Sequence, residues 1–367
     1  MGGVPRSGIV RRLFVAGPLV GGLVLLAACE HARPFAPGAP EPNVPFTTDL
    51  PRQLTFSAGL TRDPSWFPDG SALVYSFELP QPDRDRCLGV LPAPGGHLTQ
   101  AICPVPSRLD RDSTNVLSNP AVSADRRLAF LREGSLVGAQ LPSTRELIVA
   151  SLARPDSQRV VLSFPYTAPD GRLHEGLSHL HWLDAGRLVF LALQIAYPSP
   201  PNPPDTVVTP VEVAILDVSG GGPVTVVPNT VGATSVNVSN RGTLVVTMQG
   251  DAVVYEVQAS SGLRTPLFDF DTLGAVVDAQ VAGTTVLAVG RGLTVRLGAG
   301  QLYAADLATG GVRALTTWIF AYYQRPALDP SGARVAAEQH AVTYVGAEGG
   351  PPDTLLARPA HLWLVPL

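Results

Sequence analysis

Residues 62–77 read RDPSWFPDGSALVYSF, and this stretch contains the pattern that decides the fold. A short segment ends at Trp66 and Phe67, Pro68-Asp69-Gly70 follows, and residues 72–77 are rich in apolar and aromatic side chains. Pro, Asp and Gly in this order favour a tight turn, because Pro presets φ and Gly accepts positive φ. The stretch therefore predicts two antiparallel strands joined by a turn.

The same arrangement recurs five times further along the chain. The first strands of these units contain Asn119–Val122, His179–Trp182, Ser235–Val238, Asp278–Val281 and Arg325–Leu328. From position 63 in the first unit to position 325 in the sixth, equivalent positions of successive units are on average 52 residues apart. This length is enough for four short strands. Long helical periods are absent, and 36 Gly and 36 Pro separate the short segments. We predict an all-β fold, a six-bladed β-propeller of four-stranded blades spanning residues 50–367.

The two ends of this region predict how the ring closes. The last unit ends in an apolar strand, His361–Val365, with no fourth strand after it, whereas Arg52–Phe56 precedes the first unit. Pairing these two segments would complete the last blade and cover both exposed strand edges. We therefore expect the N-terminal strand to pair with the C-terminal blade.

The first unit resembles a known repeat. Leu54-Thr55-Phe56, followed by Asp63-Pro64-Ser65-Trp66-Phe67-Pro68-Asp69-Gly70, is similar to the WD40-like repeat of TolB-type periplasmic propellers. The last unit matches in part, at Asp329-Pro330-Ser331-Gly332, and the other four keep only the spacing and the apolar pattern. The resemblance implies a propeller fold and an extracytoplasmic location.

The N-terminus indicates export. Arg6, Arg11 and Arg12 precede an apolar run of 16 residues, 13–28, which is shorter than the ~20 residues that span a bilayer. Leu26-Ala27-Ala28-Cys29 resembles a lipobox, so we predict a lipoprotein signal peptide over 1–28 and lipidation of Cys29. An ordinary signal peptide followed by a chance Cys is the alternative. Glu30 favours the outer membrane, on its periplasmic or surface side, and both Sec and twin-arginine export remain open.

Residues 29–49 are rich in Pro and Ala and predict a tether to the membrane. The net charge of −4 argues against nucleic acid as a partner, and the absence of Lys excludes lysine-based catalysis. Cys87 and Cys103 form an even pair once Cys29 carries lipid, which predicts a disulfide in an oxidising compartment. Two partly buried thiols are the alternative.

A polar position recurs in the innermost strand of every unit. It holds Asp63, Asn119, His179, Ser235, Asp278 and Arg325, and His181 follows two residues after His179. Because alternate residues of a strand share a face, we expect these side chains to line the channel mouth and the apolar residues that end the same strands, Trp66 and Trp182 among them, to pack between blades. Long connections on the same face, 78–86, 133–145, 196–210 and 340–358, mark it as a binding surface. A merely solvated channel with neutral loop insertions is the alternative.

The sequence favours a binding module over an enzyme. His174-Glu175 and His179 depart from the zincin spacing by one residue, although His174, His179 and His181 could form a metal site. A Gly-x-Ser-x-Gly elbow and a phosphate-binding loop are both absent. We therefore predict no catalytic residue and no cofactor, and a membrane-anchored scaffold whose loop-rich face binds a protein or peptide. A metal-dependent hydrolase or lyase acting at the channel mouth is the alternative.

Overall fold

The computed structural model describes residues 51–56, 59–79, 85–93, 96–104, 113–136, 144–196, 207–219, 223–291, 300–317, 321–345, 353–356 and 360–367. Residues 46–367 form one compact unit. The predicted signal peptide, Cys29 and the predicted tether lie outside the described residues. Within the described ranges, no helix has the length and hydropathy needed to cross a membrane.

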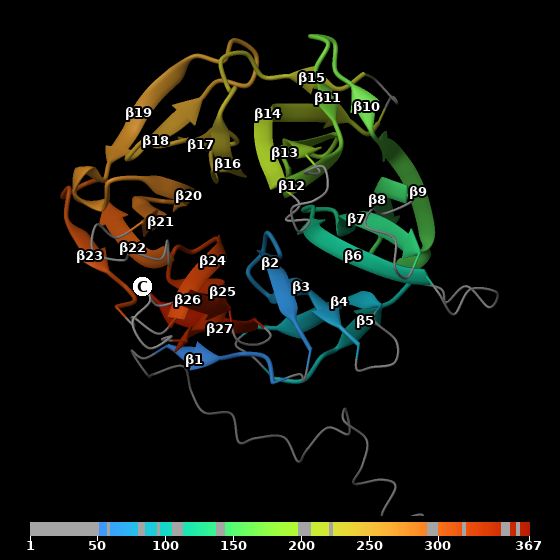
Figure 1. The fold of residues 1–367 in the computed structure, drawn as a ribbon, viewed down its shortest axis with the longest axis horizontal. Helices are drawn as coiled ribbons and strands as arrows, with labels where there is room; N and C mark the ends of the chain where they lie inside the picture. The colour runs from blue at the N-terminus through green and yellow to red at the C-terminus, as the bar shows by residue number, and fades with distance from the viewer. Residues whose placement is uncertain are drawn as a thin grey trace, which may run out of the picture. The chain divides into compact units, whose positions relative to one another are not determined.

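The chain folds into antiparallel sheets that are arranged radially, as in a β-propeller (Figure 1). Three sheets are separate four-stranded meanders, in which each strand pairs with the next. Their strands are β12 (Gly176–Trp182), β13 (Arg187–Ala196), β14 (Val207–Asp217) and β15 (Thr225–Val226); β16 (Ala233–Val238), β17 (Leu244–Met248), β18 (Val253–Val257) and β19 (Arg264–Asp269); and β20 (Val276–Ala282), β21 (Thr285–Arg291), β22 (Gly300–Asp306) and β23 (Val312–Ala314). A 3-10 turn, η1 (Asp271–Leu273), precedes β20.

The first two units join into one eight-stranded sheet, where the sequence predicted separate blades. One half contains β2 (Thr61–Trp66), β3 (Ala72–Glu78), β4 (Arg86–Pro92) and β5 (Gln100–Ile102); the other contains β6 (Ser113–Val122), β7 (Arg127–Leu136), β8 (Thr144–Ser151) and β9 (Arg154–Phe164). The halves meet at one parallel bridge, between Arg86 and Val116. This bridge depends on how two units approach in space, so no local pattern predicts it.

The predicted pairing of the two ends is confirmed. β1 (Arg52–Gln53) pairs with β27 (His361–Pro366), with Arg52 opposite Leu364 and Gln53 opposite Trp363. Beyond β1, the N–H of Leu54 donates to the carbonyl of Leu362 at 2.7 Å. The sheet continues through β25 (Arg334–Val345) to the innermost strand, β24 (Ala321–Leu328).

Parts of the long connections are strands instead of loops. β7 and β14 extend into the connections at 133–145 and 196–210, and β26 (Asp353–Leu356) pairs with the outer part of β25. The remaining residues of these connections lie outside the described part of the chain.

Apolar side chains from neighbouring sheets form the core. In one cluster, Leu147 and Phe164 of the second unit pack with Leu188 and Phe190 of the third. Burying such a side chain contributes roughly 1.5–3 kcal/mol. These apolar residues therefore pack the second and third units against each other.

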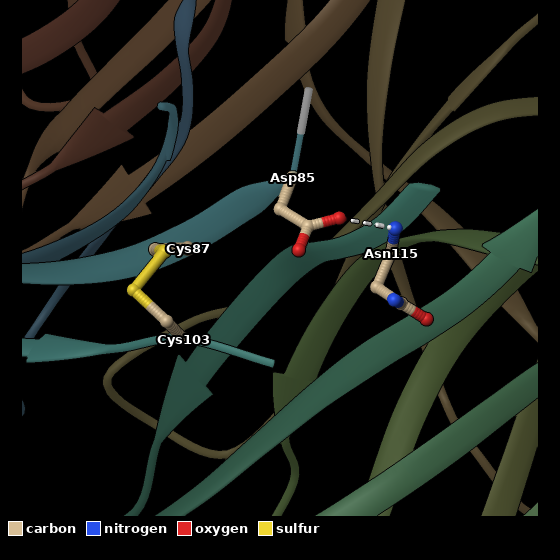
Figure 2. Close-up of a disulfide and its surroundings, with 4 residues drawn as sticks. All are labelled: Asp85, Cys87, Cys103 and Asn115. Carbon is tan, nitrogen blue, oxygen red and sulfur yellow. Dashed lines mark hydrogen bonds between the residues drawn. A yellow bond between two sulfur atoms is a disulfide. The ribbon is translucent and has the colours of Figure 1, made fainter. Parts of the chain in front are cut away.

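A disulfide closes the chain between β4 and the segment after β5. It joins Cys87 and Cys103, as the sequence predicted (Figure 2). Next to it, the backbone N–H of Asn115 donates to Oδ1 of Asp85 at 2.7 Å. The covalent link lies within the first unit, whereas the Asp85–Asn115 hydrogen bond connects the first two units near the Arg86–Val116 bridge.

Candidate binding site in the central channel

The innermost strand of every unit is irregular at the predicted channel position. Each contains a register shift there, as between Arg62 and Ser65 or between Ser178 and His181. Four of the channel residues adopt positive φ: Asp63 (54°), Asn119 (49°), His179 (49°) and Arg325 (44°). The strict alternation expected from the sequence is therefore wrong at this point, because a β-bulge inserts a residue and re-aims the side chains.

Asp63 joins the first, second and last units. Its carboxylate forms an ion pair with Arg325 and accepts a hydrogen bond from the backbone N–H of Asn119 at 3.1 Å. Its own N–H donates to Oε1 of Glu338 at 2.8 Å. Asp63 is buried, whereas the Arg325 side chain remains 39% exposed. Asp63 is thus already occupied by bonds within the protein.

His179 and Asp278 form a second pair, with Nε2 and Oδ2 3.2 Å apart. Asn237 Nδ2 donates to the other carboxylate oxygen of Asp278 at 3.1 Å. The three residues come from three successive sheets, so the pair spans part of the channel. Ser235, also predicted for the mouth, is fully buried and bonded to Thr247.

Two cavities lie along the channel, one on each side of the predicted channel residues. The larger one is about 620 Å³ and the smaller one about 300 Å³. The smaller cavity is lined by His179, Asp278 and Arg325, together with Tyr323 and Gln324. A third cavity of only about 40 Å³ shares lining residues with both and lies between them. The predicted residues therefore form a constriction in the channel and not an open mouth.

The larger cavity opens on the face opposite the long connections. Its rim contains Pro68, Asp125, Asp184 and Pro330, which lie in turns that follow the innermost strands. We call this face the turn face. The long connections begin where the second strands end, for example after Glu78, and antiparallel pairing places these two points at opposite ends of a sheet.

Two tryptophans form walls of the larger cavity. Trp66 Nε1 donates to the carbonyl of Ala327 at 2.8 Å, and Trp182 Nε1 donates to that of Ala121 at 3.1 Å. Both bonds reach the preceding unit. The guanidinium of Arg127 lies 4.6 Å from the centre of the Trp182 ring, which adds a cation–π contact. The sequence suggested only a packing role for these rings, since their exposure depends on the neighbouring unit.

The acidic side chains at the rim are paired. Asp125 contacts Arg127 at 2.8 Å, Asp184 contacts Arg187 at 2.6 Å, and Asp329 contacts Arg334 at 2.9 Å. The partner comes from the same turn in each case, because an Asp before a turn and an Arg after it lie side by side. These pairs are exposed or half-exposed, except that Asp329 is buried, and they leave the rim without a strong charge.

The innermost part of the larger cavity is polar and uncharged. His181, Ser65, Asn237 and Gln280 line both this cavity and the constriction, and we call them the floor. Burial and, to a smaller extent, the neighbouring His179 lower the pKa of His181 to about 4. His181 is therefore neutral at physiological pH.

The three histidines considered for a metal are separated by their partners. His174 is fully buried, where Nε2 contacts Glu212 at 2.9 Å and Nδ1 contacts the hydroxyl of Tyr166. Tyr166 lies in a hairpin of β10 (Tyr166–Thr167) and β11 (Leu173–His174) that the sequence did not predict. Among the described residues, no group of three or more His, Cys, Asp or Glu side chains is arranged to hold a metal.

Comparison with known proteins finds similar structures at low sequence identity. No protein-family model and no curated protein matches the chain. Among solved structures, TolB from Acinetobacter baumannii is 16% identical, with a TM-score of 0.46, over 84% of this chain and 64% of that one. The RRP9 WD40 repeats are 12% identical with a TM-score of 0.49 (86% and 97% covered), and an oligogalacturonate lyase in complex with manganese is 12% identical with a TM-score of 0.45 (86% and 93%). The chain thus spans less than two thirds of the TolB structure. The strand order of this chain itself shows the β-propeller fold.

Proposed function

We propose that this chain is a lipid-anchored, extracytoplasmic binding protein that holds a segment of a protein or peptide partner in the turn-face cavity. The cavity carries this proposal. Its volume of about 620 Å³ lies in the range typical of ligand sites, and it combines apolar walls with a few polar groups. Trp66 and Trp182 provide the large rigid surfaces that often dominate binding energy at interfaces.

The proposal moves the partner from the loop face, favoured by the sequence, to the turn face. The smaller cavity on the loop face is lined by His179, Asp278 and Arg325, and each of these side chains already has an ionic partner. The floor of the larger cavity keeps polar groups available. Binding also has more support than the alternative of a metal-dependent hydrolase or lyase, which would need His179 and Asp278 for its own chemistry.

We also infer that the ring consists of six repeat units, with the eight-stranded sheet counted as two. That sheet contains two successive meanders, β2–β5 and β6–β9, and among the described residues the one strand pairing between them is the Arg86–Val116 bridge. An experimental structure that joined the halves by further pairing would contradict this count.

The location rests on the N-terminal sequence and on one covalent bond. The Leu-Ala-Ala-Cys29 segment supports lipidation, Glu30 favours the outer membrane, and the Cys87–Cys103 disulfide suits an oxidising compartment. Mass spectrometry of protein recovered from the detergent phase should find the lipid on Cys29. The Cys29→Ser variant should appear in the aqueous phase, and equal partitioning of both proteins would contradict lipidation.

A blocking substitution tests the cavity. Ala124 is exposed and lines the cavity, so Ala124→Trp should fill part of it. Ala308 is equally exposed in a turn on the same face but lies outside the cavity, so Ala308→Trp is the matched control. A partner cross-linked from envelope extracts should be retained by the wild type and by Ala308→Trp and lost with Ala124→Trp. Equal retention by all three proteins would refute the proposal.

A further inference from the structure

We infer that His181 contacts the innermost group of the bound segment, and that this group is uncharged and both donates and accepts hydrogen bonds, as a primary amide or hydroxyl does. This inference rests on the proposed function, because it specifies the chemistry of the partner's tip. The supporting observation is that Gln280 and Asn237 of the floor are hydrogen-bonded within the described part of the protein, whereas His181 is not.

Gln280 is fully engaged within the protein. Its Nε2 donates to the carbonyl of Pro326, and its Oε1 accepts from the N–H of Leu328 at 2.7 Å. Both ends of the amide thus connect the sheet of β20 to that of β24. Gln280 therefore has little capacity left for a ligand, although it faces the cavity.

Asn237 is engaged through its donor. Nδ2 contacts both Asp278 Oδ1 at 3.1 Å and the carbonyl of Ala279 at 2.8 Å. In contrast, the His181 ring makes no hydrogen bond within the described residues, although it is only partly exposed at the constriction. A half-buried imidazole without a protein partner needs water or a ligand to satisfy its nitrogens.

The charge state of the floor limits what can bind there. A neutral imidazole presents one N–H donor and one acceptor nitrogen, which complements an amide or a hydroxyl. A cationic tip would have no free carboxylate, since Asp278 is bonded to both His179 and Asn237. An anionic tip would meet no cation on the floor. Burying either charge without a partner is unfavourable.

Panning of a phage-displayed library of random cyclic heptapeptides tests this inference. Wild-type protein should enrich peptides with Asn, Gln, Ser or Thr at one position between apolar residues. His181→Asp places a carboxylate at the same point, so it should enrich Lys or Arg at that position. Ala124→Trp should enrich neither class, and Ala308→Trp should behave as the wild type does.

The experiment distinguishes a failure of the proposed cavity site from a failure of the inference about His181. If Ala124→Trp retains the same peptides as the wild type, the turn-face cavity is not the site and the proposed function is wrong. If retention depends on the cavity, but wild type and His181→Asp select the same sequences, or the wild type selects charged tips, only the inference about His181 is wrong.

A second pair of variants covers the possibility that His181→Asp does not fold. For one peptide selected on the wild type, His181→Phe should weaken binding at least tenfold, because the ring remains but both polar nitrogens are lost. His181→Gln keeps a donor and an acceptor and should bind within about threefold of the wild type. Equal affinity of the Phe and Gln variants would overturn the inference.

Discussion

His179 and Asp278 belong to sheets that are not neighbours, yet His179 Nε2 lies 3.2 Å from Asp278 Oδ2. The sheet of β16–β19 lies between theirs in the chain, and its Asn237 contacts the same carboxylate. Three sheets are therefore connected through one buried Asp, which narrows the channel and separates its two cavities.

This connection predicts that replacing Asp278 lowers the free energy of unfolding more than replacing His179 does. Asp278→Ala should lower the free energy of unfolding by about 2–3 kcal/mol, since Asn237 would lose a charged acceptor in a buried place. His179→Ala should cost about 1 kcal/mol, because its side chain is partly exposed. A double-mutant cycle by urea denaturation should give a coupling energy of at least about 0.5 kcal/mol. Additive effects would show that the pair does not stabilise the ring.

Backbone strain at the channel predicts an unusual preference for Gly. Asn119 has a φ of 49°, and among the described residues its side chain hydrogen-bonds only to the hydroxyl of Ser118. Asn119→Ala should therefore be less stable than Asn119→Gly by about 1 kcal/mol, since a Cβ is unfavourable at positive φ. Thermal or urea unfolding of both variants measures the difference.

Ser235 is the matched control for this comparison, because it occupies the corresponding position without positive φ. There the order should reverse, with Ser235→Gly less stable than Ser235→Ala by about 0.5–1 kcal/mol. The same order at both positions would contradict the role assigned to the bulge.

His181 predicts a loss of stability in mild acid. Its pKa is lowered from 6.5 to about 4 in the folded protein, so between these values the unfolded chain binds more protons. The free energy of unfolding should therefore fall as the pH decreases from about 6.5 towards 4, by up to about 1.4 kcal/mol per pH unit from this group. Urea denaturation at several pH values measures the slope.

His181→Gln isolates this contribution from that of other titrating groups. The variant should lose part of the slope between pH 6 and 4, whereas slopes that coincide with those of the wild type would mean that His181 is protonated normally in the folded state.

The disulfide predicts a measurable dependence on reductant. The link between Cys87 and Cys103 spans 16 residues, and a loop of about this length contributes about 3 kcal/mol. Adding reductant, or replacing both residues by Ala, should lower the free energy of unfolding by about 2–4 kcal/mol. The double variant should be insensitive to reductant. Unchanged stability in the reduced protein would show that the disulfide does not stabilise the first unit.

Much of the fold followed from local patterns in the chain. The turn at Pro68-Asp69-Gly70, the alternation in the strands and the regular spacing of the units are properties of short segments, so they predicted the strands and the propeller. The pairing of Arg52–Gln53 with β27 also followed, because the sequence predicts no fourth strand in the last unit and an extra strand before the first unit. The pairing of Cys87 with Cys103 followed from an even cysteine count.

The chemistry of the channel was decided by tertiary contacts. The sequence identified Asp63, His179, Asp278 and Arg325 as channel residues, but it placed them at an open mouth. Their positions at a constriction result from β-bulges and from ion pairs between sheets far apart in the chain. A sequence pattern of period two describes a single strand, so it contains no information about β-bulges or about ion pairs between sheets.

The location of the large cavity is the clearest case of this limit. Trp66 and Trp182 looked like core anchors, and only the approach of Ala327 and Ala121 from preceding units fixes the indoles as cavity walls. The strands were determined by the chain's own short-range chemistry. The site was determined by which units meet around the axis, because a cavity exists only where several separated segments leave space between them.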